Sequence, residues 1–504
     1  MPHLSKRRWF SRGTVLLAMA AVVSVLLAGT AWTYRTDIRL LAQYVRPIDD
    51  RERVGTRNDG YDVLFLVLDA CRPDKFSAYG FERETTPAID TLADDPDATV
   101  FRRHYVNGNW TKASTASLFT GMFVHEHGIF KPWRPTASES TGRAYSTQVL
   151  SGEIETMAEM FAKEGYYTFA IVQGRHLDPQ FGFAQGFEEY YTEADFWDDR
   201  PRMWATNALL ESIKGNYFGY VHLIGCHQPF PPEVRHADYM ETYGFDYAEG
   251  ERIAKGVDFT TTAIKGLINR GELELDREDV RYLNLVYEAR TRWMDENIVQ
   301  PIISQLKDVG RYDDTLIIVT ADHGEALYEH ESYAHAERFL WEEVVRVPMI
   351  VKFPKDHRPA VLGAEVSELT SSVDLLPALA DLLGRPAPAE ARGAAIFSGA
   401  FAESTLIEGH ECAEALDDCL YSWAFLEGNR KLINYPGESL LFDLQQDPLE
   451  QRSLEEERAG VAAELRNRAA EFRSASTTKF LAEDVRTEID EETIRTLRSL
   501  GYIQ

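Results

Sequence analysis

Residues 62–69 read Asp-Val-Leu-Phe-Leu-Val-Leu-Asp, and this almost continuous apolar run constrains the fold more than any other feature. A strand that is apolar at successive positions is buried on both faces, as the strands of parallel sheets are. Comparable strand-like runs at 167–172, 218–224 and 316–319 alternate with helix-like stretches such as 154–163 and 280–299. Residues 60–390 are therefore predicted to form an α/β fold with a mainly parallel central sheet and helices on both faces.

The C-terminal part, residues 391–504, follows a different pattern. Residues 431–435 and 439–443 are strand-like, and Pro436-Gly437 between them indicates a tight turn. A helix-like stretch follows at about 454–473. We expect a small α+β subdomain built on an antiparallel hairpin.

Two of the apolar runs end in side chains that bind metals. Asp322-His323 follows the run 316–319, and Asp69 closes the run 62–69. Open α/β sheets place their ligand sites at the carboxyl ends of strands, and a carboxylate with an imidazole suits a divalent ion such as Zn²⁺ or Mn²⁺. Taken singly, each residue could equally be an ordinary turn residue or helix cap.

A third polar segment, residues 109–121, carries small hydroxyl side chains into a helix-like apolar stretch. The pattern places Thr111 at or just before a helix N-terminus, where free N–H groups and the helix dipole favour an anion. A threonine hydroxyl is a poor nucleophile at neutral pH, but a metal bound to its oxygen makes it usable. The alternative is an ordinary Ser/Thr helix cap.

Together these segments resemble the sulfatase branch of the alkaline phosphatase superfamily. The resemblance extends from about residue 60 to the C-terminus, and its segments keep the order seen in that family. They are residues 67–74, 79–80, 85–90, 111–121, 220–230, 320–325, 346–351, 373–377, 441–448 and 500–503.

One departure from the sulfatase pattern decides the chemistry that the resemblance implies. Sulfatases oxidise a Cys or Ser to formylglycine within a Cys-x-Pro-Ser-Arg motif, but Thr111 holds the nucleophile position here. Ala113 and Thr115 replace the Pro and the Arg, while Ser114 keeps the frame. The pattern is more similar to that of enzymes with a Thr nucleophile, namely lipoteichoic acid synthases, phosphoethanolamine transferases and phosphodiester or phosphonate monoester hydrolases.

The resemblance to these enzymes implies one divalent metal ion, either Mn, Zn, Ca or Mg, as the cofactor. Its ligands would be Asp69, Thr111, Asp322 and His323. Ala70 stands where sulfatases often have another Asp, so one ligand of that family is missing here.

Four further residues are expected around this metal site. His227 follows the strand-like run 218–224, and His335 has a spacing from His323 that resembles a histidine of phosphoethanolamine transferases near the substrate or a second metal. Either histidine could protonate a leaving oxygen and contact the substrate. Lys112 and Arg72 could neutralise charge on a phosphoryl group as substrate-binding cations, and Lys112 is also a catalytic candidate.

Net charge and cysteine content limit the possible partners and disulfides of the protein. The formal net charge of −28 argues against a nucleic-acid partner, because nucleic-acid binding needs a basic face. A saline habitat or an ordinary solubilising surface would each explain the acidity. Cys412 and Cys419 are close enough for a local disulfide, whereas Cys71 and Cys226 could be buried thiols or a second bridge.

The N-terminus predicts a membrane anchor. Residues 1–13 are basic and expected in the cytoplasm, 14–33 form an uncharged apolar run long enough to span a bilayer, and 34–59 form a juxtamembrane linker. Residues 28–31, Ala-Gly-Thr-Ala, could instead be a signal-peptide cleavage site, which would give a secreted protein. In either case residues 60–390, the expected catalytic domain, lie outside the cytoplasm.

The sequence thus predicts a membrane-anchored, outward-facing, metal-dependent hydrolase or transferase of phosphodiesters or phosphomonoesters. Thr111 would form a covalent phospho-threonine, which water or an acceptor hydroxyl then clears. Three alternatives remain: a sulfatase without formylglycine, a phosphoglycerol- or phosphoethanolamine-type transferase on surface lipids or glycans, and a non-catalytic surface-binding protein.

Overall fold

The structure, a computed structural model, describes most of the chain beyond residue 51. The described residues are 52–56, 60–131, 134–135, 144–173, 175–193, 199–228, 237–244, 263–335, 339–412, 419–476 and 482–488. The predicted anchor at 14–33, most of its linker and the motif at 500–503 lie outside these ranges. Within them, no helix has the length and apolar character needed to cross a bilayer.

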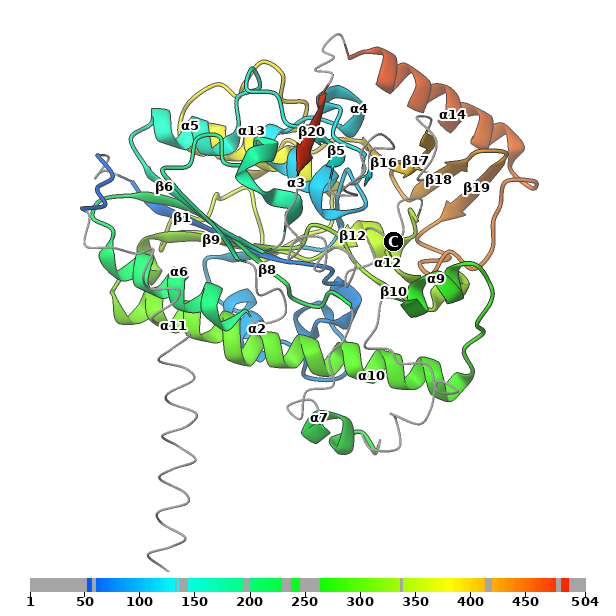
Figure 1. The fold of residues 1–504 in the computed structure, drawn as a ribbon, viewed down its shortest axis with the longest axis horizontal. Helices are drawn as coiled ribbons and strands as arrows, with labels where there is room; N and C mark the ends of the chain where they lie inside the picture. The colour runs from blue at the N-terminus through cyan, green and yellow to red at the C-terminus, as the bar shows by residue number, and fades with distance from the viewer. Residues whose placement is uncertain are drawn as a thin grey trace, which may run out of the picture. The chain divides into compact units, whose positions relative to one another are not determined.

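An eight-stranded sheet forms the centre of the described fold, in the order β14-β2-β13-β9-β1-β8-β6-β7 (Figure 1). Its strands are β1 (Asp62–Leu68), β2 (Ala98–Phe101), β6 (Tyr167–Gln173), β7 (Glu189–Glu193), β8 (Tyr217–Leu223), β9 (Thr315–Thr320), β13 (Met349–Lys352) and β14 (Glu365–Val366). β1 runs parallel to both β8 and β9, while β13 is antiparallel to its two neighbours. The apolar side chains of β1 are fully buried, as expected for a central strand covered on both faces.

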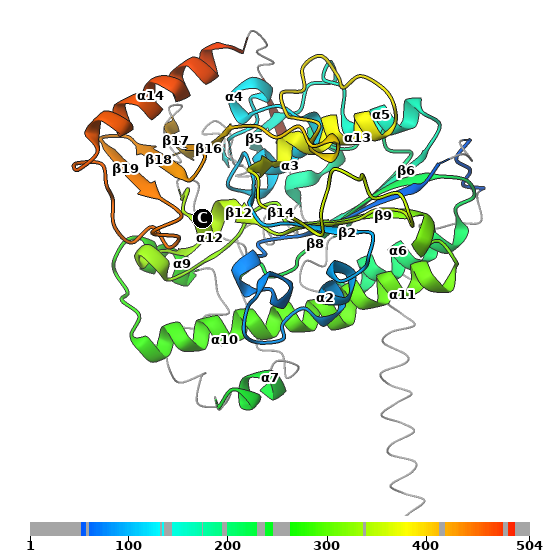
Figure 2. The same ribbon diagram turned by 180° about the vertical axis from the view of Figure 1, so that it is seen from behind.

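Helices cover both faces of this sheet, which confirms the predicted architecture. Figures 1 and 2 show α3 (Thr111–Thr120), α5 (Met157–Lys163) and α13 (Leu375–Leu382) on one face. On the opposite face lie α2 (Pro87–Ala93), α6 (Arg200–Ser212), α10 (Arg277–Met294) and α11 (Gln300–Asp308).

Helix ends differ from the sequence-based expectation because of local capping. α5 begins at Met157, later than expected, because Thr156 and Glu159 form a capping box that fixes its start. α10 begins earlier than expected, since Asp276 caps the N–H groups of Glu278 and Asp279.

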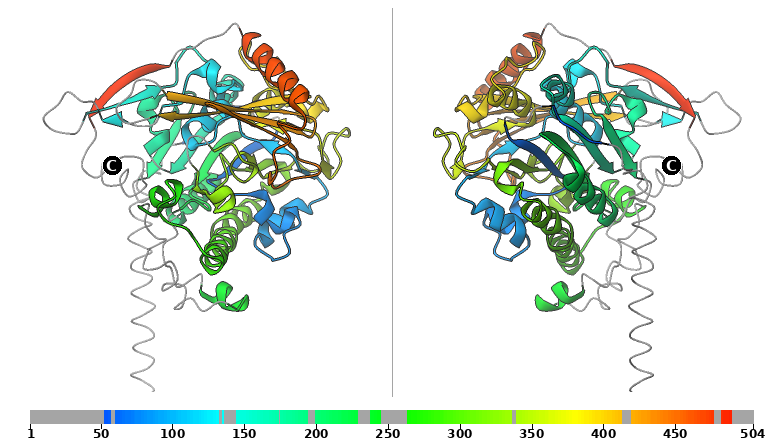
Figure 3. Two further views of the ribbon diagram at one scale, coloured as in Figure 1. Left: turned by 90° about the vertical axis from the view of Figure 1, so that its right-hand side faces the viewer. Right: turned by 90° about the vertical axis from the view of Figure 1, so that its left-hand side faces the viewer.

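A separate antiparallel sheet forms the C-terminal part (Figure 3). Its strands are β16 (Ser404–Cys412), β17 (Cys419–Glu427), β18 (Arg430–Tyr435) and β19 (Glu438–Asp443), with α14 (Ala459–Ser474) packed against them. The predicted hairpin is confirmed as β18–β19, and Gly437 makes its turn with φ of 87°. The predicted domain boundary at residue 390 stays a prediction.

Two buried histidines, His104 and His127, make the stability of the fold depend on pH. His104 lies beside the Thr370 hydroxyl and His127 beside that of Ser117, and burial lowers the pKa of both imidazoles to about 3. Because the ordinary value is 6.5, the unfolded chain takes up more protons between pH 6.5 and pH 3. The contribution of each histidine to the free energy of unfolding is therefore lost as the pH falls through that window.

We expect His104→Asn to reduce the change in the free energy of unfolding between pH 7 and pH 4 by roughly 3 kcal/mol, because the titrating group is gone. Denaturant unfolding at a series of pH values measures this difference. The exposed His357 provides the matched control, His357→Asn, whose profile should follow the wild type. An unchanged slope in His104→Asn would contradict the prediction.

Candidate active site

Three neighbouring strands deliver the site residues to one edge of the sheet. Asp69 directly follows β1, His227 lies beyond the end of β8, and Asp322-His323 follows β9. These strands are parallel, so their carboxyl ends meet at the same edge. All four side chains are buried.

The four predicted metal ligands come together there. The Nε2 atom of His323 lies 3.3 Å from Oδ1 of Asp69, 3.8 Å from Oδ2 of Asp322 and 3.4 Å from Oγ1 of Thr111. The donor atoms of Asp69, Asp322 and His323 all lie within 4.8 Å of one another. The spacing of these donors is that of a site able to hold a single ion.

The protonation pattern of the site fits a cation. Nδ1 of His323 lies 2.8 Å from the carbonyl oxygen of Gly324, and because a carbonyl only accepts, Nδ1 carries the proton. In the neutral ring, Nε2 then directs its lone pair at two carboxylates and a hydroxyl. Such a cluster of acceptors, taken out of water, is stabilised by a divalent cation with oxygen and nitrogen ligands.

Contacts outside the ligand set orient Asp322. Nε2 of His222, on β8, lies 3.2 Å from Oδ2 of Asp322, and the N–H of His323 donates to Oδ1 over 3.0 Å. Burial alone would raise the pKa of the Asp322 carboxyl, but His323 and His222 outweigh it and hold the pKa far below its ordinary value. Asp322 is therefore ionised and available as a ligand at any physiological pH.

Thr111 occupies the first turn of α3, as the sequence predicted. The preceding Trp110 is extended and acts as the cap position, so the Thr111 side chain is free of a capping role. The tight approach of the chain depends on Gly108, because a Cβ there would lie 2.8 Å from the Ala113 Cβ atom. The hydroxyl thus lies among the candidate metal-binding atoms and beside the positive end of a helix.

Two more histidines complete the cluster. The ring of His335 lies 4.1 Å from that of His323 and 5.0 Å from that of His227, centre to centre. Nδ1 of His335 lies 3.0 Å from Oε1 of Glu325, while Oε2 of Glu325 accepts the N–H of Gln228 over 3.1 Å. Burial lowers the pKa of both outer imidazoles, to about 3 for His227, so both are neutral.

Lys112 and Arg72, the two cations predicted to bind substrate, both contact other residues of the protein. Lys112 is fully buried and its ammonium donates to the Thr147 hydroxyl over 2.6 Å and to the Gln148 carbonyl. The Arg72 guanidinium forms a two-point pair with Asp74 and also pairs with Glu329. Their predicted roles toward substrate stay predictions, and these contacts fix the positions of both side chains.

Sequence reasoning missed several residues near this cluster. His222 lies within the strand-like run 218–224 and Glu325 ends the motif 320–325, and neither was given a role of its own. His176 is buried against the Trp110 ring at 5.5 Å, and burial, with Lys112 and His323 nearby, lowers its pKa to about 3. For His222, a histidine inside an otherwise apolar strand was the available signal, whereas His176, between Arg175 and Leu177, offered none.

Comparison with known proteins identifies the family. The sulfatase family model matches residues 61–385, and the model named N-sulphoglucosamine sulphohydrolase, C-terminal, matches residues 329–475. The chain therefore belongs to the sulfatase family of the alkaline phosphatase superfamily, whose members are metal-dependent enzymes that cleave or transfer esters.

Relatives within this superfamily differ in chemistry. The chain is 23% identical over 415 residues to N-acetylglucosamine-6-O-sulfatase of Bacteroides thetaiotaomicron, covering 66% of this chain and 70% of that protein. It is 23% identical over 296 residues to Kdo(2)-lipid A phosphoethanolamine 7''-transferase of Salmonella typhimurium, covering 58% of this chain and 45% of that protein. Among solved structures, phosphonate monoester hydrolase of Agrobacterium radiobacter shares the fold with a TM-score of 0.63 and 19% identity, covering 82% of this chain and 95% of that one.

Proposed function

We propose that this protein is a divalent-metal-dependent hydrolase or transferase of phosphate esters that uses Thr111 as its nucleophile. The supporting observation is the position of the Thr111 hydroxyl, 3.4 Å from Nε2 of His323 at the start of α3. The formylglycine of ordinary sulfatases requires a Cys or Ser at this position, and a threonine leaves the hydroxyl itself as the reacting group.

Each residue of the site would have a distinct role in such a reaction. Asp69, Thr111, Asp322 and His323 would hold the ion, which when bound supplies positive charge that acidifies the hydroxyl and neutralises the phosphoryl group. Thr111 Oγ gives up its proton and attacks phosphorus, and the bond to the leaving oxygen breaks as a phospho-threonine forms, with a proton ending on that oxygen. Water or an acceptor hydroxyl then attacks the same phosphorus and frees Thr111.

His335 is the better placed of the two outer histidines to move protons. Its Nδ1 donates to Glu325, so the Nε2 lone pair can take a proton and pass it to the leaving oxygen. The Glu325 carboxylate opposite stabilises the charged ring while it carries that proton. His227 differs in that its Nδ1 lies against the Gln228 carbonyl.

Hydrolysis of a sulfate ester is the second candidate, because characterised relatives of this chain act as sulfatases. A non-catalytic surface-binding role and a transferase acting on surface lipids or glycans complete the alternatives. We also propose that the catalytic part lies outside the cytoplasm, anchored by residues 14–33. The disulfide between Cys71 and Cys226 supports this location, because such bonds persist in oxidising compartments.

A substrate screen with controlled metal content tests the proposal. Purified protein is stripped with EDTA, reloaded with Mn²⁺ or Zn²⁺, and offered p-nitrophenyl phosphate, bis-p-nitrophenyl phosphate and p-nitrophenyl sulfate. We expect turnover only after reloading, with kcat/KM at least about tenfold higher for a phosphate ester than for the sulfate, because a Thr hydroxyl replaces formylglycine. A faster reaction with the sulfate ester would favour the sulfatase alternative, and no turnover with bound metal would favour a binding role.

A further inference from the structure

Cys71 and Cys226 form a disulfide beside the site, which resolves the alternative that the sequence left open. The two residues are 155 positions apart in sequence, with their Cα atoms 5.3 Å apart, and both side chains are fully buried. Cys71 lies two positions after Asp69, and Cys226 directly precedes His227. The bond therefore joins the turn that carries a metal ligand to the turn that carries an outer histidine.

Backbone hydrogen bonds lead from the sheet up to this disulfide. β1 and β8 pair in register through Leu68 and Leu223. Beyond the strands, Asp69 donates its N–H to the Leu223 carbonyl over 2.9 Å, and Cys226 donates to the Asp69 carbonyl over 2.9 Å. Asp69 is thus held between the last rung of the ladder and the disulfide.

The turn after Asp69 needs this support because its backbone is strained. Ala70 has φ of 59°, in the left-handed region that side chains other than glycine avoid. The Tyr287 hydroxyl of α10 donates to the Ala70 carbonyl over 2.8 Å and accepts the N–H of Arg72 over 3.0 Å. One side chain thereby binds the backbone on both sides of Cys71.

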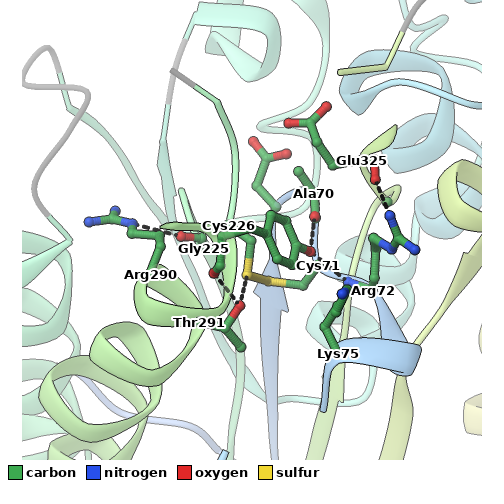
Figure 4. The surroundings of a disulfide bond; sticks show 12 residues. Ala70, Cys71, Arg72, Lys75, Gly225, Cys226, Arg290, Thr291 and Glu325 are labelled. Atoms are coloured by element: carbon green, nitrogen blue, oxygen red, sulfur yellow. Dashed lines mark hydrogen bonds between the residues drawn. A yellow bond between two sulfur atoms is a disulfide. The ribbon is translucent and has the colours of Figure 1, made fainter. Parts of the chain in front are cut away.

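The same face of α10 supports the turn of β8. Arg290 donates to the Gly225 carbonyl over 3.0 Å, and the Thr291 hydroxyl lies 3.3 Å from the Cys226 sulfur. Figure 4 shows both side chains reaching the Cys226 turn from the helix, with the disulfide between them and Ala70. Gly225 must pack closely, because a Cβ there would lie 2.7 Å from the Asp69 carbonyl oxygen.

We propose that the Cys71–Cys226 disulfide and Tyr287 form a clasp that positions Asp69 for metal binding and holds His227 beside the metal site. The inference rests on the metal site of the proposed function. The β1–β8 ladder holds the sheet without the disulfide, so loss of the clasp acts on the two turns and on Asp69 and His227, which they carry. The protein then binds its metal tightly only in the oxidised form.

The double variant Cys71→Ala/Cys226→Ala tests this proposal by calorimetric titration of metal-free protein with Mn²⁺. We expect the dissociation constant to rise at least about tenfold, the loss typical of removing a group that orients a ligand. The matched control is Cys412→Ala/Cys419→Ala, which removes the other two cysteines, register partners in the β16–β17 hairpin. The control should bind Mn²⁺ as the wild type does.

Thermal melting of the metal-free protein in EDTA distinguishes an effect of the disulfide on metal affinity from an effect on the stability of the fold alone. A lower melting temperature with unchanged Mn²⁺ affinity would show that the disulfide only stabilises the fold, and would overturn the proposal. Wild-type protein that binds no Mn²⁺ or Zn²⁺ would instead overturn the proposed metal site itself.

Tyr287→Phe provides a second test, because this variant keeps the disulfide and does not have to fold without it. It keeps the ring and removes the hydroxyl that joins Ala70 to Arg72, so Mn²⁺ affinity should fall by roughly threefold to tenfold. Wild-type affinity in Tyr287→Phe would remove Tyr287 from the clasp and contradict the proposal as stated.

Discussion

Thr111→Ala should lower kcat on the best phosphate ester by more than about 10³-fold, because the attacking oxygen and a metal ligand are lost together. Thr111→Ser should retain activity within about 10²-fold of the wild type, since the hydroxyl remains and only the methyl group is lost. Trp110, and not Thr111, occupies the cap position of α3, so neither change removes a helix cap. Steady-state kinetics at saturating Mn²⁺ measures all three proteins.

Two controls make this result specific to the nucleophile. Thr120→Ala deletes a hydroxyl at the other end of α3, where it donates to the Ala116 carbonyl over 2.7 Å, and should keep wild-type turnover. Intact-mass analysis of wild-type protein quenched during turnover should show a phosphoryl or phosphodiester adduct, and peptide mapping should place it on Thr111. Wild-type turnover in Thr111→Ala would mean that water attacks phosphorus directly.

Asp322→Ala and His323→Ala should each abolish stoichiometric metal binding, lowering the affinity by more than about 100-fold. This exceeds the loss seen when a group that merely orients a ligand is removed, because a donor atom itself disappears. Metal analysis after gel filtration gives the occupancy. Melting curves with and without Mn²⁺ give a second measure, since only a protein that binds the ion is stabilised by it.

The chain contains its own control for this experiment. Asp356-His357 repeats the Asp-His dipeptide at an exposed position, where His357 contacts the Lys355 carbonyl over 2.7 Å. Alanine at either residue should leave metal content and the Mn²⁺-dependent melting shift unchanged. Full metal occupancy in Asp322→Ala or His323→Ala would exclude the assigned site.

Apolar runs revealed the sheet because a strand buried on both faces must be apolar throughout. The ends of β1 and β9 could therefore be located, and with them Asp69 and Asp322-His323. Thr111 was recognised for a different reason, as its segment matched the position of the nucleophile in a known family. In each case the signal came from a short segment of consecutive residues.

Side chains whose partners are distant in sequence could not be predicted in this way. The substrate-binding role of Arg72 stays a prediction, whereas its pairing with Glu329, far along the chain, appears only in the folded protein. Glu325 connects to His335 and to the Gln228 backbone only once two loops meet. Such contacts depend on tertiary packing, about which local sequence pattern carries no information.

The last described strand, β20 (Glu483–Glu488), pairs antiparallel with β5 (Ala144–Val149), as Figure 3 shows. In this register Val485 lies opposite Thr147 and Asp484 opposite Gln148, the two residues that hold the Lys112 ammonium. Lys112 adjoins Thr111, so one strand pair connects β20 to the neighbour of the proposed nucleophile. Proteolytic removal of β20 would leave one edge of β5 without its strand partner and weaken the support of Lys112, the residue next to the proposed nucleophile.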